Sequence, residues 1–227
     1  MKQQTSIPAL SFFCFSLGLS PAIGAAPEDT LQYLEHSQNY VLIKPGGNIV
    51  VDLRYASSNN FVGQNLYGGF SQAWLHRVAY IKLTKAARLL QKQRPGYRLK
   101  IYDALRPRSV QRVLWQKVKG SAQQKYVARP ERGSIHNYGF AVDVSIVGPV
   151  GNELDMGTGF DDFRPLSQPR LEQHFRAIGQ LSQNQLDNRL LLRTVMTRAG
   201  FTQLPLEWWH FDAMPAAKVR RGFSIIE

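Results

Sequence analysis

Two short segments, far apart in the chain, carry residue types that bind metal ions and hydrolyse bonds. The first, 134–143, contains His136 and Asp143, and the second, 207–210, contains Glu207 and His210. Two imidazoles and one carboxylate match the three protein ligands that catalytic zinc usually takes, with the fourth position left to water. A second carboxylate beside that water could take its proton and pass it to a leaving amine. Together these residues predict a zinc peptidase.

Neither segment is specific by itself. On a regular strand, Glu207 and His210 would point to opposite faces, so both can serve one metal only if the strand ends, bulges or twists there. In the first segment, Gly139 permits the tight turn that would bring the loop histidine and the strand aspartate together. The structural alternative is that both histidines are hydrogen-bonded core residues and that Glu207 is a surface acid.

Hydrophobic periodicity predicts the elements that must position these residues. The expected strands cover 49–55, 98–102, 140–146 and 206–211, and the expected helices cover 71–93, 109–119 and 184–199. Gly200 is a typical stop for the last helix, and Asp143 is expected on the sheet face opposite Val142 and Val144. The pattern predicts an α+β fold: a single domain with a mostly antiparallel sheet flanked by helices.

The N-terminal segment predicts export. Residues 1–25 contain one charge, Lys2, then an apolar stretch over 7–19 and small residues near the end, as in a secretory signal peptide. The apolar stretch is too short for a membrane anchor, and Cys14 lacks the small preceding residue expected of a lipid-modified cysteine. We expect a signal peptide over 1–25, a domain over 26–227 without stable membrane insertion, and a periplasmic or otherwise exported product.

The chain is strongly basic, with a formal net charge of +12 and a pI of about 10.0. Such a charge suggests nucleic acid as a partner for a cytosolic protein, but the expected export argues against nucleic acid here. The basic residues are dispersed at helical spacing, which is typical of solvated faces. Attraction to an anionic envelope surface is the open alternative.

Five groups of residues occur together in one order. They are Asp52-Leu53-Arg54-Tyr55-Ala56 with Asn60-Phe61-Val62-Gly63, Asp103-Ala104-Leu105-Arg106-Pro107, Ser134-x-His136-x-x-Gly139-x-Ala141-x-Asp143, Met156-Gly157-x-x-Phe160-Asp161, and Glu207-Trp208-Trp209-His210. In these groups the chain resembles the D-alanyl-D-alanine dipeptidases of the vancomycin-resistance type, within the zinc D,D-peptidases. The ligand motifs are shared with the carboxypeptidases of that wider group, whereas the Met-Gly-x-x-Phe-Asp group points to the dipeptidases. The resemblance implies a fold shared with zinc D,D-peptidases and hedgehog signalling domains.

The resemblance implies a metal site and a general base. His136, Asp143 and His210 match the ligands of one Zn²⁺ per chain, although cobalt or nickel could also bind such a set in vitro. Glu207 matches the general base, in agreement with the chemistry expected from its residue type.

Three more residues match positions that contact the substrate. Arg106 matches the arginine that steadies the oxyanion of the transition state, with an ion pair to Asp103 as the alternative. Asp161 matches the acceptor of the free substrate ammonium, which would restrict the enzyme to dipeptides, and Asp162 is the adjacent alternative. Ser134 matches a serine that lines the substrate pocket, or it shapes the loop.

Three functions follow as hypotheses. The first is an exported zinc dipeptidase that hydrolyses D-Ala-D-Ala to two D-alanines in peptidoglycan turnover or D-alanine salvage. The second is a zinc D,D- or L,D-carboxypeptidase that trims peptidoglycan stem peptides. The third is a non-catalytic zinc module, which would not need Glu207 and Arg106 together. The sequence leaves the oligomeric state open.

Overall fold

The structure is a computed structural model that describes residues 28–227, so the expected signal peptide over 1–25 lies outside the described residues. The α-helices are α1 (Glu28–His36), α2 (Arg77–Gln93), α3 (Arg108–Val118), α4 (Glu172–Ala177), α5 (Gln183–Ala199) and α6 (Ala216–Gly222). The strands are β1 (Tyr40–Leu42), β2 (Ile49–Val51), β3 (Trp74–His76), β4 (Arg98–Asp103), β5 (Ala141–Val147), β6 (Thr202–Gln203) and β7 (His210–Asp212). The predicted mixture of helices and strands is therefore confirmed.

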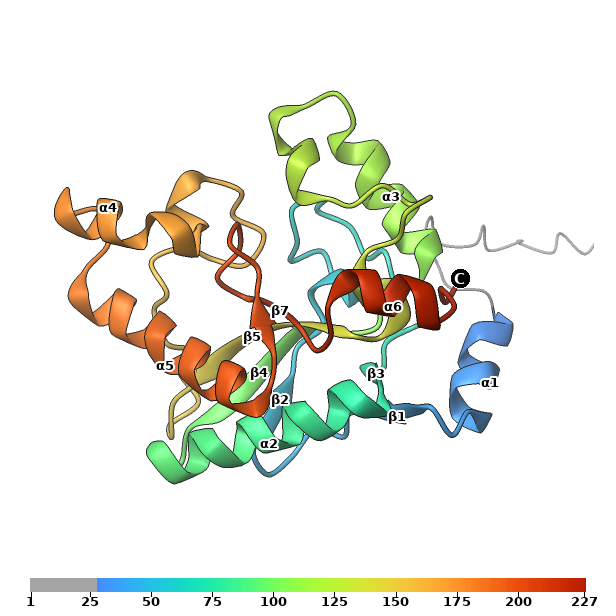
Figure 1. Cartoon of the computed structure of the whole chain (residues 1–227), viewed down its shortest axis with the longest axis horizontal. Coiled ribbons are helices and arrows are strands. Elements are labelled where there is room, and N and C mark those ends of the chain that lie inside the picture. Colours follow the sequence, from blue (N-terminus) through green and yellow to red (C-terminus); the bar gives the residue numbers. More distant parts are fainter. Residues whose placement is uncertain (1–27) are drawn as a thin grey trace, which may run out of the picture.

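A five-stranded mixed sheet with the order β2-β4-β5-β7-β6 forms the centre of the fold (Figure 1). The β2–β4 pair is parallel, and the other three pairs are antiparallel. The expectation of a mostly antiparallel sheet is therefore met in part, because the pair at the β2 edge is parallel. A separate antiparallel pair joins β1 to β3.

Helices α2 and α5 pack against each other, and α2 also contacts β4 (Figure 1). The buried side of α2 consists of small and aliphatic residues at helical spacing, including Ala79, Leu83 and Leu90. The α5 helix begins with a capping box between Ser182 and Gln185 and ends at Gly200, whose φ of 101° suits glycine. This start and end agree closely with the predicted helix over 184–199.

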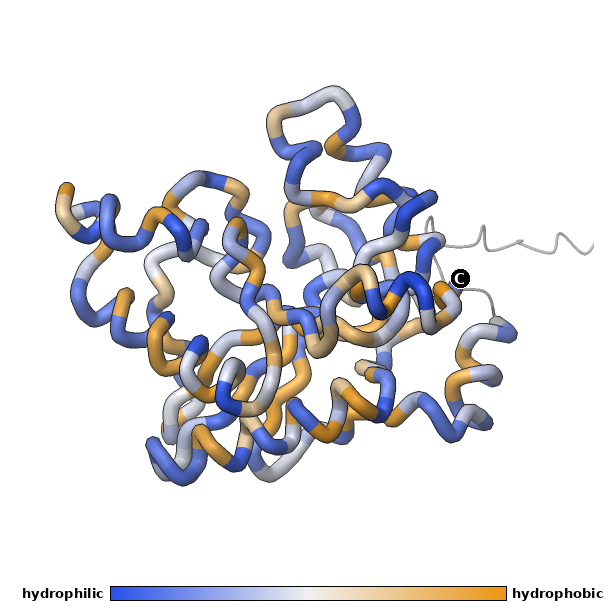
Figure 2. Tube along the Cα trace, in the orientation of Figure 1, coloured by the Kyte–Doolittle hydropathy of each residue, from blue (hydrophilic) through white to orange (hydrophobic). Residues whose placement is uncertain are grey.

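The core surrounds β5, which is buried along its whole length. Figure 2 shows hydrophobic residues in the central strands, while the helices contain both hydrophilic and hydrophobic residues along their length. The strand was expected to be half-buried, but both of its faces are covered. Burial of both faces makes β5 a rigid support for any polar side chain that it carries. No helix within residues 28–227 is long and apolar enough to cross a membrane.

Three predicted elements have different boundaries in the structure. The expected helix over 71–93 begins only at Arg77, because Leu75 and its neighbours form β3. The expected strand over 49–55 ends at Val51, and a short 3₁₀ helix follows at Arg54–Ala56. The expected last strand over 206–211 was wrong for Leu206 to Trp209, because the strand begins at His210. This late start places Glu207 in a loop.

Candidate active site

Strand pairing brings the two predicted metal-binding segments together at the centre of the sheet. Asp143 on β5 lies opposite His210 on β7 and opposite Asp103 on β4. Residues directly opposite in adjacent strands have neighbouring side chains on one face. The register therefore gathers three ionisable side chains from three distant parts of the sequence.

His136 reaches this group from a short 3₁₀ helix, Ile135–Tyr138, that precedes β5. Gly139 ends the helix with a φ of 72°, and a Cβ atom there would lie 2.9 Å from the backbone nitrogen of His76. Only glycine combines this conformation with such a close approach. The Arg106 N–H donates to the His136 carbonyl at 3.1 Å, so the loop is also fixed to the segment after β4.

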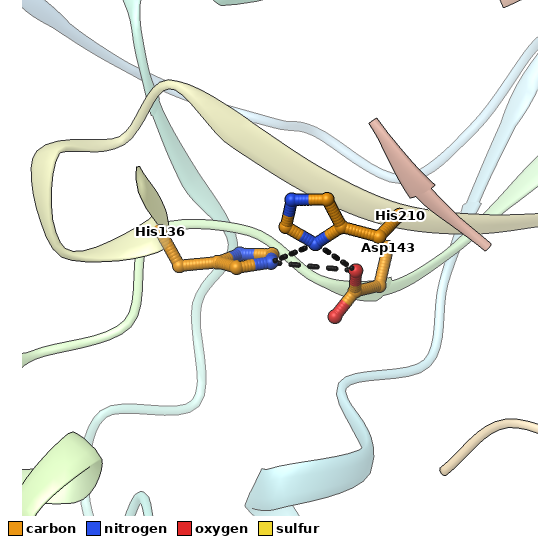
Figure 3. A group of neighbouring side chains, drawn as sticks. All are labelled: His136, Asp143 and His210. Carbon is orange, nitrogen blue, oxygen red and sulfur yellow. Dashed lines mark hydrogen bonds and ion pairs between the residues drawn. The ribbon is translucent and has the colours of Figure 1, made fainter. Parts of the chain in front are cut away.

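The nitrogen and oxygen atoms of His136, Asp143 and His210 form a nearly equilateral triangle (Figure 3). Nε2 of His136 lies 3.1 Å from Nδ1 of His210 and 3.3 Å from Oδ1 of Asp143. The third side, from His210 Nδ1 to Asp143 Oδ1, is 3.0 Å. Ligands at tetrahedral angles around zinc, with bonds of about 2.0–2.1 Å, lie about 3.3 Å apart. The spacing therefore fits a zinc ion.

The hydrogen bonds made by the outer ring nitrogens of the two imidazoles are also compatible with metal binding. Nδ1 of His136 donates to the Ala104 carbonyl at 2.7 Å, and Nε2 of His210 donates to the Asp212 carboxylate at 2.9 Å. These bonds leave the lone pairs of the other ring nitrogens directed at Asp143. Three such acceptors need a cation between them, either a proton or a metal ion.

The electrostatics of the cluster agree with this requirement. Burial disfavours the charged form of His210, but its hydrogen bonds to Asp143 and Asp212 raise its pKa well above the ordinary value. Burial likewise opposes ionisation of Asp143, yet His136 and His210 hold its pKa well below the usual range. A site that stabilises positive charge this strongly binds either a proton or a metal ion.

Glu207 lies beside this cluster, with its Oε2 atom 4.0 Å from Nδ1 of His210. Its loop is held by a hydrogen bond from the Trp208 indole to Thr158 and by a second from Gln203 to the Trp208 carbonyl. Burial, with repulsion from Asp143, raises the pKa of Glu207 to about 8, against the attraction of His210. A carboxyl with a pKa near neutrality suits a general base.

Arg106 forms the ion pair that the sequence left open and also faces the cluster. Its Nε and Nη2 atoms donate to Oδ2 of Asp103 at 2.8 and 2.6 Å, and Nη1 donates to Gln111 at 2.9 Å. The Nη2 atom also lies 3.7 Å from Oδ2 of Asp143. A guanidinium has five N–H donors, so these three bonds leave two of them for a ligand.

Asp161 lies on the other side of Arg106. Its Oδ1 atom accepts a hydrogen bond from the Tyr55 hydroxyl at 3.0 Å, and the Tyr55 ring packs against the Arg106 guanidinium at 4.9 Å. Burial, with added repulsion from Asp143, raises the pKa of Asp161 to about 7. Within residues 28–227, Asp161 is the only non-glycine residue with a positive φ, 60°. Such strained conformations concentrate at functional sites.

The neighbouring Asp162 has a different environment. Its carboxylate pairs with Arg164 at 2.9 Å, and it does not line the pocket that contains Asp161. The loop that carries both residues is fixed to α5 by Arg189, which donates to the carbonyls of Met156 and Leu166 at 2.7 and 3.0 Å. The structure therefore favours Asp161 over Asp162 as the predicted substrate-binding carboxylate.

Ser134 caps the short helix that carries His136, accepting a hydrogen bond from the His136 N–H at 3.4 Å. It has the loop-shaping role that the sequence left open, and it also lines the pocket. One pocket of about 290 Å³ is lined by all the predicted site residues: Arg106, Ser134, His136, Asp143, Asp161, Glu207 and His210. Its size suits a small ligand.

This combination of a triad that could hold a metal ion, a buried carboxyl and a small pocket agrees with comparisons to known proteins. The profile of a peptidase family described as D-ala-D-ala dipeptidase matches residues 40–226. The chain belongs to this family. Because the match covers nearly all described residues, family membership extends over the sheet, the pocket and α6.

Three relatives carry the name D-alanyl-D-alanine dipeptidase. The protein from Escherichia coli is 35% identical over 170 residues, which are 75% of this chain and 81% of the relative. The protein from Synechocystis is 26% identical over 64% of this chain and 71% of its own length. The protein from Enterococcus faecium is 27% identical over 70% of this chain and 83% of its own length.

In this member of the D-ala-D-ala dipeptidase family, two groups around the site were not predicted from the sequence. Asp212 orients His210, and the Tyr55 hydroxyl holds Asp161. The contact of Asp212 with His210 could have been predicted from their spacing, because residues two apart on a strand point to the same face. Tyr55 stands in the first group of the resemblance, but its contact with Asp161 joins segments that are distant in the sequence.

Proposed function

We propose that the protein is an exported zinc-dependent dipeptidase that hydrolyses D-Ala-D-Ala to two D-alanines. The observation that carries this proposal is the single small pocket that joins the triad of His136, Asp143 and His210 to Glu207 and Asp161. The names of the relatives support the same substrate. The residues that line the pocket could supply the metal ligands, a general base, a donor to the oxyanion and an acceptor for the substrate ammonium.

Each of the main residues of the site has a part in the proposed hydrolysis. Zinc, when bound by the triad, supplies Lewis-acid polarisation of the scissile carbonyl. Glu207 removes the proton of the attacking water and then delivers it to the departing amine. The free N–H groups of Arg106 donate to the carbonyl oxygen as it becomes negative. Asp103 and Gln111 hold the guanidinium in place, so little reorganisation is needed during the reaction.

The environment of Asp161 supports a dipeptide over a longer peptide. Its buried carboxylate can pair with the free ammonium of a dipeptide, and Tyr55 orients it toward the pocket. A substrate whose amine is acylated would bring no charge to this position and would leave the ionised carboxylate unpaired. The carboxypeptidase alternative requires acceptance of such substrates.

Export rests on the sequence of residues 1–25, with its early lysine and short apolar stretch. An exported dipeptidase would act on dipeptides released outside the cytoplasm, which suits peptidoglycan turnover or D-alanine salvage. A fusion of residues 1–40 to a reporter enzyme that is active only after export tests this part. Activity that persists when the apolar stretch over 7–19 is deleted would count against it.

The enzymatic part is tested with purified zinc-loaded protein. We expect release of D-alanine from D-Ala-D-Ala, loss of release with a chelator, and no release from an N-acylated tripeptide ending in D-Ala-D-Ala. Cleavage of the acylated tripeptide would favour the carboxypeptidase. Zinc binding without either activity would favour a non-catalytic module.

A further inference from the structure

A free dipeptide carries a positive ammonium group and a negative carboxylate. The residues discussed so far offer a partner only for the ammonium group. Asp161 offers a partner for the ammonium group, but the carboxylate at the other end also needs a partner once it leaves water. This requirement rests on the proposed dipeptidase function. A cationic side chain that lines the pocket and has no carboxylate partner within the protein could bind the substrate carboxylate.

Three permanently cationic side chains line the pocket: Arg106, Lys125 and Arg220. Arg106 is already paired with Asp103. Lys125 is exposed and already lies over the ring of Tyr126 at 5.2 Å. Arg220, on α6, is half-buried, and no carboxylate of residues 28–227 lies within ion-pair distance of it. Arg220 is therefore the cation best suited to an incoming carboxylate.

The donors of Arg220 are only partly used. Its Nη2 atom donates to the Gly133 carbonyl at 3.2 Å. Its Nε atom is buried, so a ligand in the pocket does not reach it. Its Nη1 atom is not buried and makes no hydrogen bond within residues 28–227, so it is open to a ligand. The two Nη atoms of a guanidinium carry N–H groups that can donate to the two oxygens of one carboxylate.

The position of Arg220 also suits the far end of a dipeptide. Side-chain interactions run in order from Asp161 through Tyr55, Arg106, Asp143, His210 and Asp212 to Arg220. In this order the metal-binding triad lies between the carboxylate of Asp161 and the guanidinium of Arg220. The pocket thus contains a negative group, Asp161, and a positive group, Arg220, and the triad links them in this series of contacts. A dipeptide carries the complementary charges, a positive amine and a negative carboxylate.

We propose that Arg220 binds the C-terminal carboxylate of the dipeptide substrate and so determines specificity at that end. The last helix of the chain would then take part directly in substrate recognition. Asp161 would bind the amino terminus of the ligand and Arg220 its carboxyl terminus. Together they would exclude peptides that are extended at either terminus.

The test compares two ligands and three variants by binding calorimetry. The ligands are D-Ala-D-Ala and its C-terminal amide, which lacks the carboxylate charge. All proteins are zinc-loaded full-length chains with Glu207→Gln, so that binding is measured without turnover. The variants are Arg220→Gln, Arg220→Lys and, as a matched control, Arg221→Gln, which changes an exposed arginine on the same helix.

Arg220→Gln should weaken binding of D-Ala-D-Ala by about 10- to 100-fold, as expected for loss of a charge-assisted hydrogen bond. Binding of the amide should stay unchanged, Arg220→Lys should recover part of the loss, and Arg221→Gln should have no effect. An equal loss for both ligands would overturn the proposal, since it would indicate a structural role through Gly133. Unchanged binding of D-Ala-D-Ala would also overturn it.

The proposed function is tested separately by turnover of D-Ala-D-Ala in the protein with Glu207 intact. Absence of turnover would overturn the dipeptidase proposal, while the difference between the two ligands would still decide the role of Arg220. A protein that binds neither ligand would overturn both.

Discussion

The Oδ1 atom of Asp212 lies 2.9 Å from Nε2 of His210, two positions away on β7. This carboxylate fixes the ring so that Nδ1 faces His136 and Asp143. Carboxylates in such positions orient ligand histidines and increase their basicity. We therefore predict that Asp212→Asn weakens zinc affinity by about 10- to 100-fold, measured by competition with a chromophoric chelator. Asp187→Asn, at an exposed position on α5, is the control and should leave zinc affinity unchanged.

Glu207 is expected to act on water without holding the metal. Glu207→Gln keeps the size of the side chain but removes the base, so kcat for D-Ala-D-Ala should fall by about 10²- to 10⁴-fold. Zinc content, measured by atomic emission, should stay at one ion per chain. Glu35→Gln, on the exposed side of α1, should leave both quantities unchanged. Loss of zinc from the Glu207 variant would instead assign Glu207 to the metal.

Asp161 should make ligand binding depend on pH. Its raised pKa of about 7 means that the carboxyl is neutral below that pH and ionised above it. Only the ionised form attracts the substrate ammonium, so the affinity for D-Ala-D-Ala should fall by about tenfold per pH unit below pH 7. The measurement uses the zinc-loaded Glu207→Gln protein, which has no titrating Glu207.

The matched control for this pH dependence adds Asp161→Asn to the same protein. The double variant should bind weakly at every pH and should lose the dependence near pH 7. A dependence that survives in the double variant would assign the titration to another group, such as a protonated ligand histidine.

Removal of the metal should destabilise the fold. His136, Asp143 and His210 direct three acceptors at one another, and this arrangement is unfavourable without a cation. Zinc at about 1,000 times its dissociation constant should add about 4 kcal/mol to the free energy of unfolding. Calorimetric melting with zinc and with a chelator measures the difference. Melting temperatures that agree within error would contradict it.

Gly139 should affect both stability and metal binding. In Gly139→Ala, the new Cβ atom would lie 2.9 Å from the His76 nitrogen in a left-handed conformation. We expect a loss of about 1–3 kcal/mol in the free energy of unfolding, together with weaker zinc binding, because the loop of His136 must shift. Gly179→Ala has a similar φ of 73° but open space around it, so it should be strained without affecting zinc.

Local sequence signals predicted several features of the fold correctly. The end of the α5 helix follows from Gly200, which can adopt the φ of 101° required there. The strand over 140–146 follows from alternating residues, and the structure places it at 141–147. These signals depend on contacts between residues close in sequence, which is why a single sequence contains them.

The segment before β7 shows where such signals fail. Its apolar residues suggested a continuous strand over 206–211, but the backbone turns before His210. The reason is tertiary: the Trp208 indole donates to Thr158, and the ring of Trp209 packs against Phe160 at 5.5 Å. Both partners lie in the distant loop that carries Asp161. The resulting loop places Glu207 and His210 on one site, which a regular strand would have prevented.

The sequence by itself determined which residue types were present for metal binding, proton transfer and recognition of charge, because these follow from side-chain chemistry. Only the tertiary structure decided how they converge. The register of β4, β5 and β7 places Asp143 opposite His210, and the strained backbone of Asp161 lies in a loop that Tyr55 and Arg189 of α5 hold by hydrogen bonds. The register of strand pairs and the hydrogen bonds that hold loops depend on contacts between distant segments. A single sequence does not reveal those contacts.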